Sequence, residues 1–212
     1  MKLEKYTEQL KRLPVSGRQI IGQTDGKNII VYQAFNSLIA DYAVKHQKFG
    51  GEHYSFTRMS WIKPGFLWMM YRAGWASKEH QQRILAITLP LEHFKTVLNN
   101  ATISSFVHNI YSTHELWQSE LEKTEGRLQW DPDHTPQGEK QERKAIQLGM
   151  KGSLLKKFCT EWIIKIEDIT PFVHKQYQKL KENELDDLEI PFEEVITLNE
   201  EAINKRLGIC RS

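Results

Sequence analysis

The chain has 212 residues, of which 40% are hydrophobic and 26% are charged, and its formal net charge is +2 at pH 7. This length and composition indicate one ordinary globular domain. The small net charge excludes a protein that binds nucleic acid through its whole surface, and no apolar run approaches the ~20 residues that a membrane helix needs. Any nucleic-acid contact would therefore use a local basic patch, and we expect no membrane partner.

The two cysteines and the N-terminus favour a cytoplasmic protein. The first residues alternate charged and apolar side chains and lack the apolar stretch of a secretory signal. Cys159 and Cys210 are too few and too far apart for a disulfide scaffold, and the histidines are not spaced as metal ligands. We therefore predict no metal cofactor.

Taken in chain order, the hydrophobic pattern predicts an N-terminal helical arm over 1–14, a core domain over 15–180 and a C-terminal helical extension over 181–212. Helices and strands alternate irregularly in the core, so we predict an α+β fold with a mixed, mostly antiparallel sheet and packed helices. The predicted core elements are strands 18–23 and 28–32, helix 36–49, strand 54–62, helix 64–73, strand 83–89, helices 91–99 and 113–123, strands 127–130 and 144–149, helix 153–158, strand 162–169 and a helix from Thr170.

Residues 131–143, with the sequence DPDHTPQGEKQER, contain no apolar side chain but include proline, glycine and many charges. This composition predicts a long surface loop between two strands. Such a loop has room to act as a lid over a binding site.

The strongest anomaly in the composition lies between Thr57 and Trp75, where three tryptophans share the stretch TRMSWIKPGFLWMMYRAGW. A strand here leads directly into a helix, whose N-terminus attracts anions. Arg58 and Lys63 would gather at this junction and could hold phosphate groups. The alternative is that these cations are solvated or paired and that the aromatic side chains are ordinary core.

Further candidate residues are polar side chains that lie within a predicted strand or directly after one. Gln33 closes an early strand beside Tyr32, and Gln147 lies within the apolar strand sequence AIQLG, where a buried amide needs a partner or a ligand. Asp131 follows a strand directly and is a candidate acid or base, although such an aspartate can also simply form a turn.

Five stretches together carry a family resemblance, and their sequences are YQAFNSLIADYAV, FTRMSWIKPGFLWMMYRAGW, QRILAITL, QWDPD and RKAIQLG. They resemble the bacterial and fungal family catalogued as domain of unknown function 4291, whose hallmark is the RMSWIKP run. The resemblance covers roughly residues 18–170 and implies no established activity.

The order of these elements is also similar, at the level of fold, to that of ADP-ribosyltransferases. This resemblance implies NAD as the bound nucleotide, with Arg18 or Gln33 at the early polar position and Ser60 or Trp61 at the middle one. The late glutamate of that superfamily has no counterpart here, because the corresponding strand offers Gln147. A carboxylate would have to come from Asp131, Glu139 or Glu142.

Three functions are consistent with these residues. The first is an enzyme that binds NAD or a similar nucleotide and transfers ADP-ribose to a nucleobase, nucleic acid or protein side chain. In this hypothesis Arg58 and Lys63 hold the pyrophosphate, Trp61 or Tyr32 stacks on a ring, and Asp131 or Gln147 orients the reacting sugar. The second is a non-catalytic reader of a nucleotide or of single-stranded nucleic acid. The third is a scaffold protein whose tryptophans are core.

Overall fold

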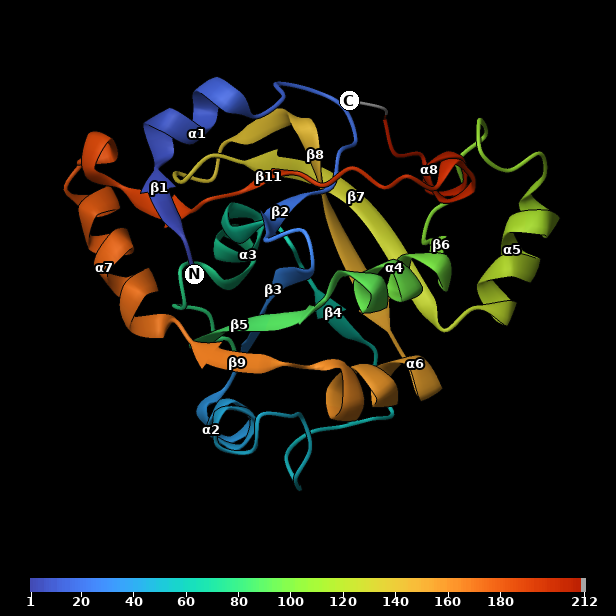
Figure 1. Ribbon diagram of the computed structural model, residues 1–212, viewed down its shortest axis with the longest axis horizontal. Coiled ribbons are helices and arrows are strands. Elements are labelled where there is room, and N and C mark those ends of the chain that lie inside the picture. The colour runs from blue at the N-terminus through green and yellow to red at the C-terminus, as the bar shows by residue number, and fades with distance from the viewer. Residues whose placement is uncertain (211–212) are drawn as a thin grey trace.

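Two larger sheets and one short sheet form the framework of the computed structural model, which describes residues 1–210 (Figure 1). The five-stranded sheet is antiparallel throughout. Its strands, in spatial order, are β11 (Glu194–Val195), β2 (Ile21–Thr24), β3 (Asn28–Phe35), β5 (Arg83–Pro90) and β9 (Lys165–Asp168).

The four-stranded sheet is built on the long β7–β8 hairpin, drawn in yellow in Figure 1, with a parallel pair only at its β6 edge. Its strands are β4 (Ser60–Ile62), β8 (Lys140–Met150), β7 (Gly126–His134) and β6 (Ala101–Ile103). A third, two-stranded sheet pairs β1 (Leu3–Lys5) with β10 (Glu189–Pro191). These mostly antiparallel sheets confirm the predicted α+β class.

Helices fill the connections between the strands. Several helices begin at capping residues: the Asn36 side chain accepts a hydrogen bond from the amide of Ile39, and Thr113 accepts one from Leu116. Gly74 ends its helix with φ of 56°, a conformation that favours glycine. The helices are α1 (Tyr6–Arg12), α2 (Ser37–His46), α3 (Phe66–Ala73), α4 (Leu91–Asn99), α5 (His114–Lys123), α6 (Gly152–Lys157), the π-helical turn η1 (Phe158–Trp162), α7 (Thr170–Lys181), the 3₁₀ turn η2 (Leu185–Asp187) and α8 (Glu201–Leu207).

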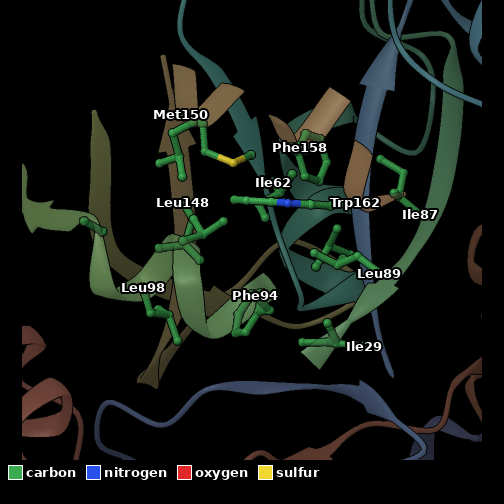
Figure 2. Packing of buried hydrophobic residues seen from close by; sticks show 14 of the residues in the cluster. Ile29, Ile62, Ile87, Leu89, Phe94, Leu98, Leu148, Met150, Phe158 and Trp162 are labelled. Atoms are coloured by element: carbon green, nitrogen blue, oxygen red, sulfur yellow. The ribbon is translucent and has the colours of Figure 1, made fainter. Parts of the chain in front are cut away.

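The main hydrophobic core lies between the two larger sheets. Figure 2 shows Leu148 and Met150 of β8 on one side, Ile87 and Leu89 of β5 on the other, and the indole ring of Trp162 between them. Every second residue of each strand points into this core because side chains alternate along a strand. The other face of each sheet points away from this core, so it is covered by other elements or carries polar side chains.

The outer face of the five-stranded sheet is covered by α3 and α7, which pack there as a second core. Phe66, Met69 and Met70 of α3 are at most 2% exposed, as the nearly uniform apolar sequence of this helix predicts. Tyr71 and Arg72 are exposed, and 38% of the surface of Tyr71 reaches solvent. One side of α3 therefore reaches solvent, next to β7.

Both ends of the chain pair with the rest of the fold. β1 and β10 form their own sheet, while β11 adds an edge strand to the five-stranded sheet. Ile203 and Leu207 of α8, which begins at Glu201, belong to the main core. No helix within residues 1–210 has the length and apolar character needed to cross a membrane.

The predicted strand over 54–62 is wrong in its first half, because only β4 pairs with a neighbouring strand. Tyr54 turns into the main core instead, where its hydroxyl lies 3.2 Å from the sulfur of Cys159. Burial of the aromatic ring prevails over the extended pairing that the alternating sequence favours.

The predicted surface loop over 131–143 is also wrong, because β7 and β8 continue into it and leave only 135–139 as a turn. Arg143 and Asp133 form an ion pair of 2.6 Å, with side chains that are only 5% and 13% exposed. Composition predicts solvent exposure here, but the pairing of the two strands buries the charges together. This hairpin is therefore not a free lid.

Candidate functional site

The candidate site is the polar face of the four-stranded sheet, which points away from the main core. Alternation puts Trp61 of β4 and Lys63, the residue after β4, on this face, because Ile62 between them lies in the core. Leu148 pairs with Ile62, so Gln147 is the residue of β8 that lies beside Lys63, and Gln147 itself pairs with Gln129 of β7. We refer to the face made by Trp61, Lys63, Gln129, Asp131 and Gln147 as the polar face.

An amide and a carboxylate are linked at the centre of the polar face. The Gln147 side chain is 9% exposed, and its Nε2 donates to Gln129 Oε1 at 2.7 Å and to Asp131 Oδ2 at 2.8 Å. Both Nε2 hydrogens of Gln147 are thereby used, which orients its carbonyl oxygen and holds the carboxylate. The second carboxylate oxygen of Asp131 stays available to accept a hydrogen bond.

Lys63 is the most unusual charge of the polar face, because it is only 6% exposed. Its backbone bridges to Tyr32, but its ammonium makes no hydrogen bond or ion pair to any other residue of the described chain. The ammonium is not among the fully enclosed unpaired atoms, so it can be reached from outside. Burial and the nearby Arg72 guanidinium lower the pKa of Lys63 to about 8, and the charge of Asp131 acts in the opposite direction.

Trp61 lies at the end of the polar face and is partly exposed. Its indole packs on Gly149, where a Cβ atom would come within 2.9 Å of the ring and within 2.6 Å of the Met59 sulfur. The missing side chain at position 149 therefore gives the indole a place on the sheet. A flat apolar ring thus stands two residues from the buried ammonium.

The turn of the β7–β8 hairpin is attached to α3 beside the polar face. The His134 ring is 2% exposed and stacks on Tyr71, with ring centroids 3.5 Å apart, and on Trp68 at 5.3 Å. The indole of Trp75 donates to the carbonyl of Pro136 at 3.2 Å. Burial lowers the pKa of His134, so the stack favours the neutral ring. These contacts hold Arg72, on the same helix, next to the polar face.

The N-terminus of α3, where the sequence predicts an anion pocket, already holds a carboxyl group of the chain. Glu193 is 3% exposed and accepts a hydrogen bond from the amide of Phe66 at 2.6 Å. A cavity of about 20 Å³ beside it has room for about one water molecule and is lined in part by Arg143 and Gln19. Burial raises the pKa of Glu193 to about 8, and the charge of Asp133 adds to the rise. The carboxyl group of Glu193, and not an external phosphate, therefore takes the Phe66 amide at this helix end, which corrects the predicted anion pocket.

Several residues predicted for the site lie elsewhere. Tyr32 is 0% exposed and packs on Phe66 in the second core, so it cannot stack on an external ligand. Gln33 faces the main core side, where its amide donates to Ser60 Oγ at 2.8 Å and joins the two sheets.

The two predicted arginines are not on the polar face. Arg58 is exposed in the segment before β4 and has no partner within residues 1–210. Arg18 lies against the C-terminal segment, where its carbonyl accepts from the Cys210 amide at 2.8 Å and its own amide donates to the Cys210 sulfur. Of the nine predicted site residues, the structure brings together Trp61, Lys63, Asp131 and Gln147.

Gln129, Arg72 and Glu193 are not among the site residues predicted from the sequence. Gln129 could have been found, because Arg127, Gln129 and Asp131 are polar at every second position of a strand. Arg127 is otherwise engaged, since its guanidinium donates to the Thr124 carbonyl at 2.9 Å after α5. No pattern in the sequence marks Glu193. It reaches the first turn of α3 only because the segment before β11, more than a hundred residues later, packs there.

Comparison with known proteins adds one finding. No curated protein matches this sequence. A family model described as a domain of unknown function (DUF4291) matches residues 19–196, a range that includes the whole polar face. The match confirms the resemblance carried by the RMSWIKP run, whereas the resemblance to ADP-ribosyltransferases has no support from it. Because the matched range covers most of the sequence, the chain belongs to the DUF4291 family.

Proposed function

We propose that this chain binds a nucleotide-like ligand on the polar face and that it is an NAD-dependent enzyme transferring ADP-ribose. The observation that carries the proposal is the row formed by Trp61, Lys63 and the Gln147–Asp131 pair on one sheet face. A ring, a cation with no partner in the described part of the chain and a held carboxylate match the base, phosphate and sugar of a nucleotide. Residues two apart on a strand are separated by about 7 Å, so the ring and the ammonium can contact different parts of one ligand.

The residues of the polar face fit the anionic and hydroxyl groups of NAD. The Lys63 ammonium has no hydrogen-bond partner among residues 1–210, and a pyrophosphate would supply one together with a compensating charge. The free oxygen of Asp131 can accept from a ribose hydroxyl, while Gln147 keeps that carboxylate in place. Trp61 offers a ring face for stacking.

NAD would supply an ADP-ribosyl group whose bond to nicotinamide breaks as a new bond to the acceptor forms. Asp131 would lie where positive charge develops on the sugar and would take the proton that the acceptor loses. Lys63 would hold the phosphates and so fix the ligand against the sheet. Gln147 acts through Asp131 and is a positioning residue.

The binding test is isothermal titration calorimetry with NAD, with ATP and a short single-stranded RNA as comparison ligands. We expect NAD to bind and Lys63→Met to weaken it at least tenfold, because the phosphate partner is lost. Lys48→Met is the matched control, since Lys48 is an exposed lysine in the segment after α2. If wild-type protein binds none of these ligands, the nucleotide proposal is refuted.

The catalytic test is nicotinamide release with candidate nucleobase, nucleic-acid and protein acceptors. Asp131→Asn should abolish release while changing NAD affinity less than threefold, because the amide is nearly isosteric but takes no proton. Binding of NAD without any release of nicotinamide would reduce the proposal to a nucleotide-binding protein without transferase activity.

A second candidate function is the binding of single-stranded nucleic acid. It is favoured by the exposed side chains of Arg58 and Arg72 and by Tyr71, which is 38% exposed beside the polar face. Binding of RNA but not NAD, with affinity that falls steeply with salt and in Arg58→Ala, would favour this local basic patch as the functional surface.

A further inference from the structure

Lys63 has an environment in which a lysine side chain becomes chemically reactive. It is 6% exposed and its ammonium has no hydrogen-bond partner among residues 1–210. A charged amine in such a place lacks the solvation that water would give it. The neutral amine, with its free electron pair, is therefore favoured relative to an exposed lysine.

Two charged neighbours complete this environment. The Arg72 guanidinium repels the ammonium form, and the Asp131 carboxylate, held by Gln147, acts on it from β7. Burial and Arg72 together lower the pKa of Lys63 to about 8, so roughly a tenth of the amine is neutral at pH 7, far more than for an exposed lysine. A desolvated lysine next to another cation is one of the ways in which proteins make an amine nucleophilic.

We propose that Lys63 is a reactive amine that forms an imine with phosphorylated aldehydes or ketones that bind to the polar face. Lys63 Nζ attacks the carbonyl carbon, and the carbonyl oxygen leaves as water with the two hydrogens of the neutral amine. Asp131 relays a proton from nitrogen to the departing oxygen, and Arg72 attracts the phosphate. The reaction needs no oxidant or reductant. It uses the same face as the proposed nucleotide site but does not require that NAD binds there.

Pyridoxal 5′-phosphate, which combines an aldehyde with a phosphate, is a direct probe when sodium borohydride traps the imine. We expect Lys63 of the folded full-length chain to be labelled at least tenfold faster than the exposed Lys48, as measured by peptide mass spectrometry at limiting reagent. The rate should rise as the pH approaches 8. Labelling of Lys63 no faster than that of Lys48 would overturn the proposal.

Two variants separate the amine from its surroundings. Lys63→Arg keeps a positive charge but removes the amine, so labelling of this peptide should vanish while phosphate-dependent binding remains. Asp131→Asn should slow labelling of Lys63 at least fivefold and leave Lys48 unchanged, whereas an unchanged rate would exclude the proton relay. NAD binding to a chain whose Lys63 is not labelled would overturn the imine proposal alone and leave the nucleotide proposal standing.

Discussion

Glu193 places an ionisable group at the first turn of α3, where it is 3% exposed and accepts a hydrogen bond from the Phe66 amide. Burial raises its pKa from an ordinary 4.5 to about 8. A carboxyl group with a raised pKa keeps its proton in the folded chain at pH values at which the unfolded chain has lost it. Its stabilising contribution is therefore present below about pH 4.5 and is lost as the pH rises through 8.

The substitution Glu193→Gln removes this titration and keeps an oxygen that can accept from the Phe66 amide. At about 1.4 kcal/mol per pH unit, the window between the two pKa values corresponds to about 5 kcal/mol in the free energy of unfolding. We expect the variant to be more stable than wild type by less than about 1 kcal/mol near pH 5 and by roughly 3–5 kcal/mol above pH 8.

The assay is urea denaturation of wild type and Glu193→Gln at several pH values from 5 to 8.5. The difference between the two proteins isolates Glu193, because His134 and Lys63 titrate in both. Glu194→Gln is the matched control at the next, partly exposed position, and it should follow wild type. A Glu193→Gln protein that is less stable than wild type at pH 8.5 would refute the reasoning, since it would mean that a charged carboxylate stabilises the end of α3.

Two further predictions concern the contacts that support the polar face. Gly149→Ala should destabilise the chain by about 1–3 kcal/mol in urea denaturation, because its Cβ would meet the Met59 sulfur and the Trp61 ring. An unchanged denaturation midpoint would show that the indole moves away at no cost. Arg143→Met should lower the free energy of unfolding by about 3–5 kcal/mol, because it leaves the carboxylate of Asp133 buried without its partner. Adding Asp133→Leu should recover most of that loss. A double variant as unstable as the single one would contradict this explanation.

The local sequence was sufficient wherever a short stretch of chain determines its own conformation. Asn36 and Thr113 cap helices because their side chains reach amides three residues away, and Gly74 ends α3 in a left-handed conformation. The apolar character of most of α3 favours its enclosure. Alternation around β4 puts Trp61 and Lys63 on one face, because a strand turns every second side chain the same way.

The candidate site depended on pairing between distant segments, which composition does not reveal. Asp131 and Gln147 were separate candidates in the sequence, and only the register of β7 and β8 made them hydrogen-bonded partners. The charged stretch after Trp130 predicts a loop, yet the extended β7–β8 hairpin and a buried ion pair order it.

The sequence by itself determined the class of fold, most of the helices and strands, and the segment around RMSWIKP as the part of the chain to examine. Only the tertiary structure decided which cation is buried and which is exposed. Arg58 and Lys63 are both basic residues of the same short motif, and they differ in what packs around them. It also decided that Glu193 fills the helix end where an external anion was expected. Burial and register are properties of the assembled chain, and they set the charge and the partners of each side chain on the polar face.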